Sequence, residues 1–143
     1  MNEQGKQRVL FLCTHNSARS QIAEGLLRQL GGDRFEAFSA GTEAVGVRPL
    51  AIRVMAELGI DISRQESKTL ERYLGEPFAA VITVCDHANE TCPVFPGAGQ
   101  RLHWSFDDPG RATGAEAEQL ATYRRVRDEI RARIQSELLA AGA

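Results

Sequence analysis

The stretch RVLFLCTHNSARS, residues 8–20, joins a short apolar run to a polar loop that carries a cysteine, an arginine and two serines. An apolar run of this length, followed by polar loop residues, is typical of a buried strand. Where such a strand ends in a loop that leads into a helix, several backbone N–H groups stay unpaired and point to one place. The stretch therefore predicts an α/β fold with a site for an oxyanion at this strand end.

Cys13 begins this loop, and we expect its thiol to act as a nucleophile. An unperturbed thiol has a pKa of about 8.5, which a helix N-terminus and a nearby guanidinium lower by one or more units. Arg19 follows six residues later, and its planar guanidinium can hold two oxygens of a tetrahedral anion. A lone cysteine at a strand end is most often a small buried hydrophobe, but the spacing to the arginine favours catalysis here.

The remaining loop residues have expected parts in the same site. Ser20 can hydrogen-bond the thiolate, and Asn16 suits a turn that visits positive φ. The backbone N–H groups of the loop would hold the oxygens of the anion that Arg19 does not bind. The predicted oxyanion-binding loop comprises Thr14, His15, Asn16, Ser17, Ala18, Arg19 and Ser20.

The composition is that of an ordinary globular protein. The chain has 143 residues, of which 43% are hydrophobic and 25% charged, and its formal net charge is −2 at pH 7. We therefore expect one domain over residues 1–143, with no general attraction for nucleic acid. The longest apolar run is too short to span a bilayer, and the N-terminus lacks a signal-peptide pattern. We expect a cytoplasmic monomer with no membrane partner.

Apolar segments rich in β-branched or aromatic residues predict four strands, over residues 8–13, 35–40, 79–85 and 101–106. Apolar residues at helical spacing predict helices over residues 20–30, 49–58 and 115–139, and a shorter one over 67–74. Alternating strands and helices indicate a four-stranded parallel sheet with helices on both faces, a three-layer α/β sandwich. Because ligands bind at the carboxyl ends of such strands, Cys13, Cys85 and the segment after Phe106 should meet at one edge.

Cys85 and Cys92 are the other cysteines, seven residues apart with polar residues between them. In a helix their Cα atoms would lie about 10.5 Å apart, whereas a disulfide needs about 4.4 to 6.8 Å. A bond between them therefore requires the intervening segment to loop out. With a reactive thiol expected near Cys85, we interpret the pair as redox-active. Two alternatives stay open: inert cysteines, or a zinc site with His87 or His103, although no close Cys-x-x-Cys pair is present.

Asp107 and Asp108 precede a Pro-Gly pair at the end of the last predicted strand. A carboxylic acid at this sheet edge can protonate a departing oxygen, and of the two we expect Asp108 to do so. The alternative is a solvated turn, because Asp-Pro-Gly is ordinary turn chemistry. The arginines within residues 124–133 alternate with acidic residues on an amphipathic helix, which indicates a solvated face rather than a nucleic-acid surface.

Together these residues resemble the low-molecular-weight protein tyrosine phosphatase superfamily, and within it the thioredoxin-coupled arsenate reductases. The resemblance rests on residues 13–20, 39–42, 59–63, 84–93 and 103–109. It implies a low-molecular-weight phosphatase-like domain over residues 1–143, which reduces arsenate to arsenite in arsenic detoxification. It also implies that no cofactor or metal is bound, and that thioredoxin, glutaredoxin or another thiol serves as the external reductant.

The implied mechanism uses all three thiols. Cys13 attacks arsenate held by the loop and Arg19, and Asp108 protonates the leaving oxygen. Cys85 then attacks Cys13 and expels arsenite, and Cys92 attacks Cys85 to free Cys13 again. The competing hypothesis is a phosphatase that hydrolyses phosphate monoesters, since phosphate and arsenate are alike in shape and charge. A third is a non-catalytic sensor of anions or redox state.

The chain departs from the family pattern at several positions. Ala18 stands where many relatives have another cysteine, and Gly110-Arg111-Ala112 stand where the phosphatases usually have aromatic residues. Some reductases of this family bind a potassium ion near the loop, at a site that Asn16, Glu24 and Ser39 match. Lys68 stands where an acidic ligand would be expected, so we hypothesise that its ammonium replaces the ion.

Overall fold

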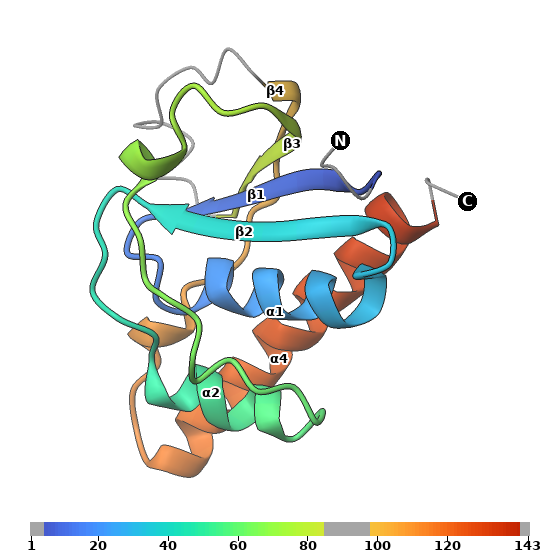
Figure 1. Ribbon diagram of the computed structural model, residues 1–143. Coiled ribbons are helices and arrows are strands. Elements are labelled where there is room, and N and C mark those ends of the chain that lie inside the picture. The colour runs from blue at the N-terminus through green and yellow to red at the C-terminus, as the bar shows by residue number, and fades with distance from the viewer. Residues whose placement is uncertain (1–4, 85–97, 141–143) are drawn as a thin grey trace.

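The structure is a computed structural model that describes residues 5–84 and 98–140. A four-stranded sheet runs through it in the order β2-β1-β3-β4, with every neighbouring pair parallel (Figure 1). The predicted parallel sheet is therefore confirmed. The strands are β1 (Gln7–Cys13), β2 (Phe35–Gly41), β3 (Phe78–Thr83) and β4 (Ala98–His103).

Helical segments cover the two faces of this sheet unequally. Three α-helices pack below it in Figure 1: α1 (Arg19–Gly31), α2 (Pro49–Ala56) and α4 (Glu116–Ile134), which runs on into a π-helical turn, η3 (Gln135–Leu139). Side chains alternate along a strand, so Val9 and Phe11 pack against these helices. Leu10 and Leu12 face the other side, where a 3-10 helix, η1 (Leu70–Tyr73), packs on the sheet.

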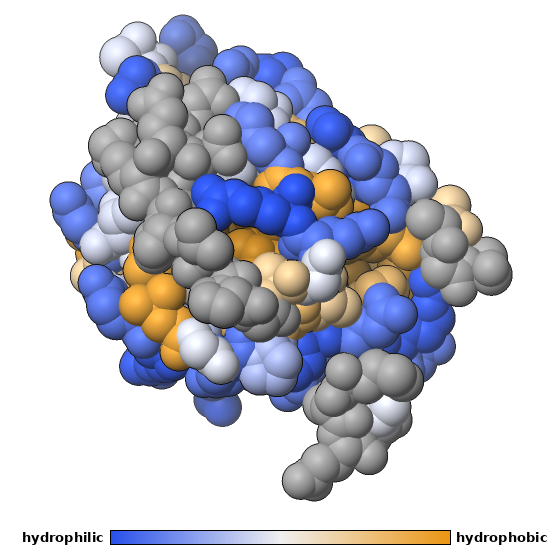
Figure 2. Space-filling view, turned by 90° about the horizontal axis from the view of Figure 1, so that it is seen from above, coloured by the Kyte–Doolittle hydropathy of each residue, from blue (hydrophilic) through white to orange (hydrophobic). Residues whose placement is uncertain are grey.

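The face that carries η1 is seen in Figure 2. Hydrophobic side chains gather in its middle and are surrounded by hydrophilic ones. The guanidinium of Arg8 lies over two aromatic rings of this cluster, 4.6 Å from the centre of Phe38 and 4.7 Å from that of Phe78. No helix within the described residues is long and apolar enough to cross a membrane.

The fourth strand lies three residues earlier than the sequence predicted. β4 ends at His103, and after Trp104 donates its N–H to the Thr83 carbonyl oxygen at 2.8 Å the chain leaves the sheet. Trp104 and Phe106 are 1% and 9% exposed and belong to the core between the sheet and the α-helices. Their apolar signal therefore reflects burial and not strand pairing.

The predicted helix over residues 67–74 is also shorter than expected, since only the turn η1 forms. Ser67 and Lys68 instead donate to Asn16, through Oγ to its carbonyl oxygen at 2.9 Å and through N–H to Oδ1 at 2.7 Å. The Lys68 carbonyl oxygen accepts the Gly41 N–H at 2.9 Å. These contacts hold residues 67 and 68 against the loop and the end of β2, and the helical turn begins only at Leu70.

Candidate active site

The loop after β1 has its carbonyl groups turned outward. The carbonyl oxygens of Thr14, His15 and Ser17 accept the N–H groups of Glu43, Val45 and Arg48, at 2.9, 3.3 and 2.9 Å. In a trans peptide the N–H points away from the carbonyl, so the N–H groups that follow point into the loop. Within the described part of the chain, no backbone hydrogen bond engages the N–H groups of residues 15–20. Inward N–H groups of this kind can bind a tetrahedral anion.

Asn16 holds the loop in this shape from inside. It is fully buried, and its φ of 49° confirms the expected left-handed turn. Its Oδ1 accepts the Lys68 N–H at 2.7 Å and Nε2 of Gln21 at 2.9 Å, and its Nδ2 donates to Oγ of Ser20 at 2.8 Å. Because the Ser20 hydroxyl accepts this bond, its own proton is free to be donated, and the bond to the Cys13 thiolate stays a prediction.

Gly41 supports the loop from the neighbouring strand. It ends β2 directly opposite Cys13. A Cβ at this position would lie 2.7 Å from the Asn16 nitrogen, 2.7 Å from the Glu43 carbonyl oxygen and 2.8 Å from the Cys13 carbonyl oxygen. All three atoms belong to the backbone, so no side-chain rotation can make room. No separate role for this glycine was predicted from the sequence, where its local signal is its position at a strand end.

We expect Gly41→Ala to destabilise the fold by about 2–3 kcal/mol and to distort the anion site, because the added methyl displaces loop backbone. Urea denaturation measures the stability. Gly46→Ala is the matched control, since Gly46 has a φ of +95° but no atom within 4 Å of its Cβ position. The control should cost only about 1 kcal/mol and keep its activity. Equal losses in both variants would show that the loop does not rest on Gly41.

Arg19 lies between the loop and the segment that follows β4. It begins α1, is 8% exposed, and donates from Nη1 to the Phe106 carbonyl oxygen at 3.0 Å. Its Nη2 lies 3.7 Å from Oδ2 of Asp108. Its Nε is buried and has no hydrogen-bond partner among the described residues. Cys13, at the end of β1, is 4% exposed. The guanidinium thus keeps one N–H donor, at Nε, that no described residue uses.

The two aspartates after β4 have different surroundings. The Asp107 side chain is 76% exposed and pairs with Arg125 at 3.0 Å, whereas that of Asp108 is 22% exposed. Oδ1 of Asp108 accepts the Gly110 N–H at 2.9 Å, and its Oδ2 faces Arg19 and, at 3.9 Å, Arg111. The structure therefore brings Asp108, and not Asp107, next to the predicted anion site.

The other predicted thiols are not placed. Cys85, Cys92 and His87 lie outside the described residues, so both their redox role and the zinc alternative stay predictions. His103 ends β4 and its Nδ1 lies 2.8 Å from the Thr83 hydroxyl. Over residues 5–84 and 98–140, no group of three or more His, Cys, Asp or Glu residues is placed to hold a metal ion.

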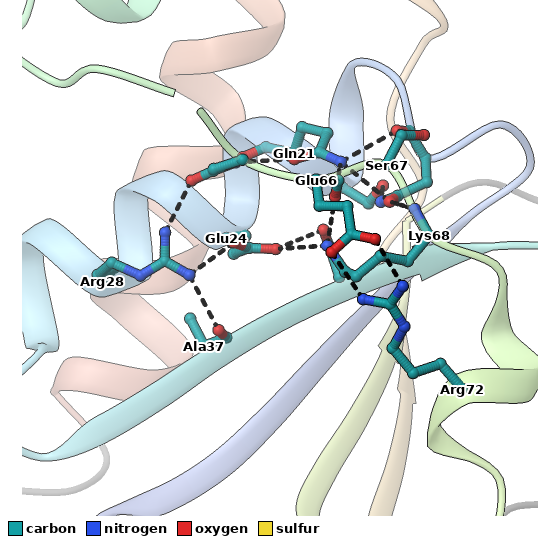
Figure 3. A network of polar contacts seen from close by, with 12 residues as sticks. Gln21, Glu24, Arg28, Ala37, Glu66, Ser67, Lys68 and Arg72 are labelled. Carbon is teal, nitrogen blue, oxygen red and sulfur yellow. Dashed lines mark hydrogen bonds and ion pairs between the residues drawn. The ribbon is translucent and has the colours of Figure 1, made fainter. Parts of the chain in front are cut away.

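A buried network around Glu24 and Lys68 lies next to the loop, since the Lys68 N–H donates to Asn16, and Figure 3 shows it. Oε1 of Glu24 accepts the Ser39 hydroxyl at 2.6 Å and lies 3.6 Å from Nζ of Lys68. Its Oε2 accepts Arg28 at 2.6 Å, and Nζ of Lys68 donates to the Glu66 carbonyl oxygen. Burial lowers the pKa of Lys68, while Glu24 acts in the opposite direction. The Lys68 ammonium therefore lies beside Glu24, one of the groups that match the potassium site.

A groove of about 600 Å³ opens beside β2, next to this network. Lys68, Glu24 and Tyr73 line part of it, but Cys13, Arg19 and Asp108 do not. The groove is therefore separate from the predicted anion site.

Comparison with known proteins gives consistent matches over nearly the whole chain. Residues 8–141 match the family model of the low molecular weight phosphotyrosine protein phosphatases. The arsenate reductase of Halalkalibacterium halodurans is 48% identical over 131 residues, which cover 92% of this chain and 94% of that protein. A solved arsenate reductase in the phosphate-binding state is 32% identical with a TM-score of 0.82, covering 96% of this chain and 99% of the other.

A further solved structure is that of a thioredoxin-dependent arsenate reductase from Corynebacterium glutamicum. It is 28% identical to this chain with a TM-score of 0.67. The match covers 97% of this chain and 65% of the other, so the solved protein is the longer of the two.

Proposed function

Because the chain belongs to the low-molecular-weight phosphotyrosine protein phosphatase family, we propose that it uses the family's anion site to reduce arsenate to arsenite. The observation that carries this proposal is the loop after β1, whose outward carbonyl groups leave its N–H groups turned inward at the end of the Cys13 strand. Arg19 and Asp108 lie together beside it. The relatives named arsenate reductase support the choice of substrate.

The first step joins arsenic to sulfur. The Cys13 thiolate attacks the arsenic atom of arsenate, while loop N–H groups and Arg19 hold three of its oxygens. The fourth oxygen is the hydroxyl of hydrogen arsenate; Asp108 donates a second proton to it, and it leaves as water when the As–O bond breaks. The arsenic is still pentavalent in this adduct.

The second step transfers the electrons. The Cys85 thiolate attacks the sulfur of Cys13, so that an S–S bond forms and the S–As bond breaks. The bonding pair stays with arsenic, which leaves as arsenite, while the two thiols are oxidised. Cys92 then attacks Cys85 and releases the Cys13 thiolate. A thioredoxin-like protein reduces the final disulfide, a proposal supported by the thioredoxin-dependent relative.

A phosphatase is the second candidate function, because the matching family model describes phosphatases and the same loop can bind phosphate. Hydrolysis of a phosphate monoester would use Cys13, Arg19 and Asp108 in the same way, with water in place of Cys85. The two functions therefore differ in whether Cys85 and Cys92 take part.

The deciding experiment uses fully reduced protein and arsenate without added reductant. We expect about one arsenite per chain and a disulfide between Cys85 and Cys92, mapped by mass spectrometry. In Cys92→Ser the same arsenite should appear with a disulfide between Cys13 and Cys85. Three free thiols and no arsenite, together with hydrolysis of p-nitrophenyl phosphate, would replace this proposal with the phosphatase.

We also propose that the activity needs no potassium, because the Lys68 ammonium lies 3.6 Å from Glu24 where the ion would bind. The rate with potassium chloride should differ by less than about twofold from that with sodium chloride at equal ionic strength, which keeps charge screening constant. Lys68→Ala should lower the rate in sodium and recover part of it in potassium. Arg72→Ala, which removes an exposed partner of Glu66, is the control without this response. A strong potassium response of the unmodified protein would contradict the proposal.

A further inference from the structure

Arg48 connects the oxyanion-binding loop to the turn that carries Asp108. Its backbone N–H donates to the Ser17 carbonyl oxygen at 2.9 Å, directly before α2. Its side chain reaches Gly110, where a Cβ would lie 3.0 Å from both Nε and Cζ of Arg48 and 3.1 Å from Oδ1 of Asp108. The guanidinium and the Asp108 carboxylate therefore flank the same point above Gly110.

The Arg48 guanidinium is held there without a full set of partners. Its Nε is buried and has no hydrogen-bond partner within residues 5–84 and 98–140. Burial raises the pKa of the Tyr123 hydroxyl, the charge of Arg48 lowers it and that of Asp108 raises it. A buried guanidinium nitrogen without an acceptor is costly, so the position indicates a use for the group.

Positive charge exceeds negative charge on this side of the site. Arg19 lies 3.7 Å from Asp108 and Arg111 lies 3.9 Å from it, and Arg48 is the third guanidinium around this carboxylate. The neighbouring Asp107 is already paired with Arg125. A multiply charged anion in the loop would therefore meet guanidinium groups that a single carboxylate does not neutralise.

Asp108 marks the side from which the leaving oxygen departs in the proposed function. In an inorganic oxyanion that oxygen carries only a proton or a charge, whereas in a phosphate monoester it carries an organic group. Because the Arg48 guanidinium lies next to Asp108 and its Nε is buried, an ester would have to place its carbon chain against a partly buried cation. An inorganic oxyanion would place an oxygen there, which accepts hydrogen bonds from the same cation.

We propose that Arg48, packed on Gly110, is a specificity-determining residue that selects inorganic oxyanions over phosphate monoesters. This proposal rests on the proposed function, since it concerns the same anion site. Gly110 is needed for this arrangement, because any side chain at this position would occupy the place of the Arg48 guanidinium.

The test compares two substrates in the same variants. The rate of arsenite formation is measured in a single turnover without reductant, and kcat/KM is measured for p-nitrophenyl phosphate. In Arg48→Leu we expect about a tenfold loss with arsenate and no loss with the ester, since one charge-assisted hydrogen bond is worth about a factor of ten. Inorganic phosphate should inhibit ester hydrolysis about tenfold more weakly. Gly110→Ala should also lower the rate with arsenate relative to that with the ester, and it should weaken inhibition by phosphate, because its methyl displaces the guanidinium.

Arg53→Leu is the matched control, because Arg53 lies on α2 and forms an exposed ion pair with Glu116 at 2.9 Å. This variant should leave the rate of arsenite formation and kcat/KM for the ester unchanged. Equal losses with both substrates in Arg48→Leu and Gly110→Ala, measured on folded protein by circular dichroism, would overturn the specificity role. If the unmodified protein forms no arsenite, the proposed function fails, and phosphate inhibition of ester hydrolysis still decides the role of Arg48.

Discussion

Replacing Cys13 with serine should abolish arsenite formation, with a loss of at least about 10⁴-fold, and leave anion binding nearly intact. A serine hydroxyl is far less acidic than a thiol, and it cannot form the disulfide that passes electrons to arsenic. The fold should tolerate the change, because serine is close to cysteine in size and the side chain at 13 is only 4% exposed. The inward N–H groups of the loop do not depend on the sulfur atom.

Single-turnover arsenite release and calorimetric binding of inorganic phosphate measure the two parts of this prediction. Cys92→Ser carries the same chemical change at another thiol and should still release about one arsenite per chain. A Cys13→Ser protein that reduces arsenate at the unmodified rate would remove Cys13 from the reaction.

Replacing Arg19 with lysine should lower the rate of arsenite formation by about 10²- to 10³-fold, the range seen when one donor to a developing oxyanion is lost. Lysine keeps the charge but cannot hold two oxygens with a planar group. It also cannot reproduce the 3.0 Å bond to the Phe106 carbonyl oxygen and at the same time face Asp108. We expect most of the loss in the chemical step and a smaller loss in phosphate affinity.

The control for this variant is Arg124→Lys. Arg124 forms two hydrogen bonds to a carboxylate, with Nε and Nη2 at 3.0 and 2.7 Å from Oε2 of Glu57, but it is on the exposed side of α4 and far from the loop in sequence. Its replacement should leave the rate of arsenite formation unchanged. An Arg19→Lys protein with the unmodified rate would show that the bidentate contact has no part in catalysis.

The fold could be predicted from the sequence where local pattern and burial agree. β1 and α1 lie within one residue of their predicted bounds, because β1 is buried on both faces and α1 ends at paired glycines. β4 lies on the edge of the sheet and all its residues are at least partly exposed, so it has no apolar run of its own. Because Trp104 and Phe106 after it are buried and apolar, the strand was predicted three residues too late in the sequence.

The candidate site also has a part that local sequence pattern could predict and a part that it could not. The residue types at strand ends pointed to Cys13, Arg19 and Asp108, since these positions follow from a strand-loop-helix pattern and a turn motif. The supports of the loop depend on contacts between distant segments, such as the Arg48 N–H on Ser17 and the Ser67 hydroxyl on Asn16. Local spacing carries no signal for such contacts. Neither Gly41 nor Arg48 could therefore be given a role from the sequence alone.

In the role proposed above, the buried Lys68 would supply its cation at a fixed stoichiometry of one per chain. A dissolved ion occupies its site by mass action, so its effect varies with the salt content of the surroundings, whereas a side chain has an effective concentration that dilution cannot change. The two sources also differ in their response to alkali. Burial lowers the pKa of Lys68, so this cation loses its charge at a lower pH than an exposed lysine does, while a metal ion has no proton to lose. In the role proposed for Lys68, the tethered charge would replace dependence on salt with dependence on alkaline pH.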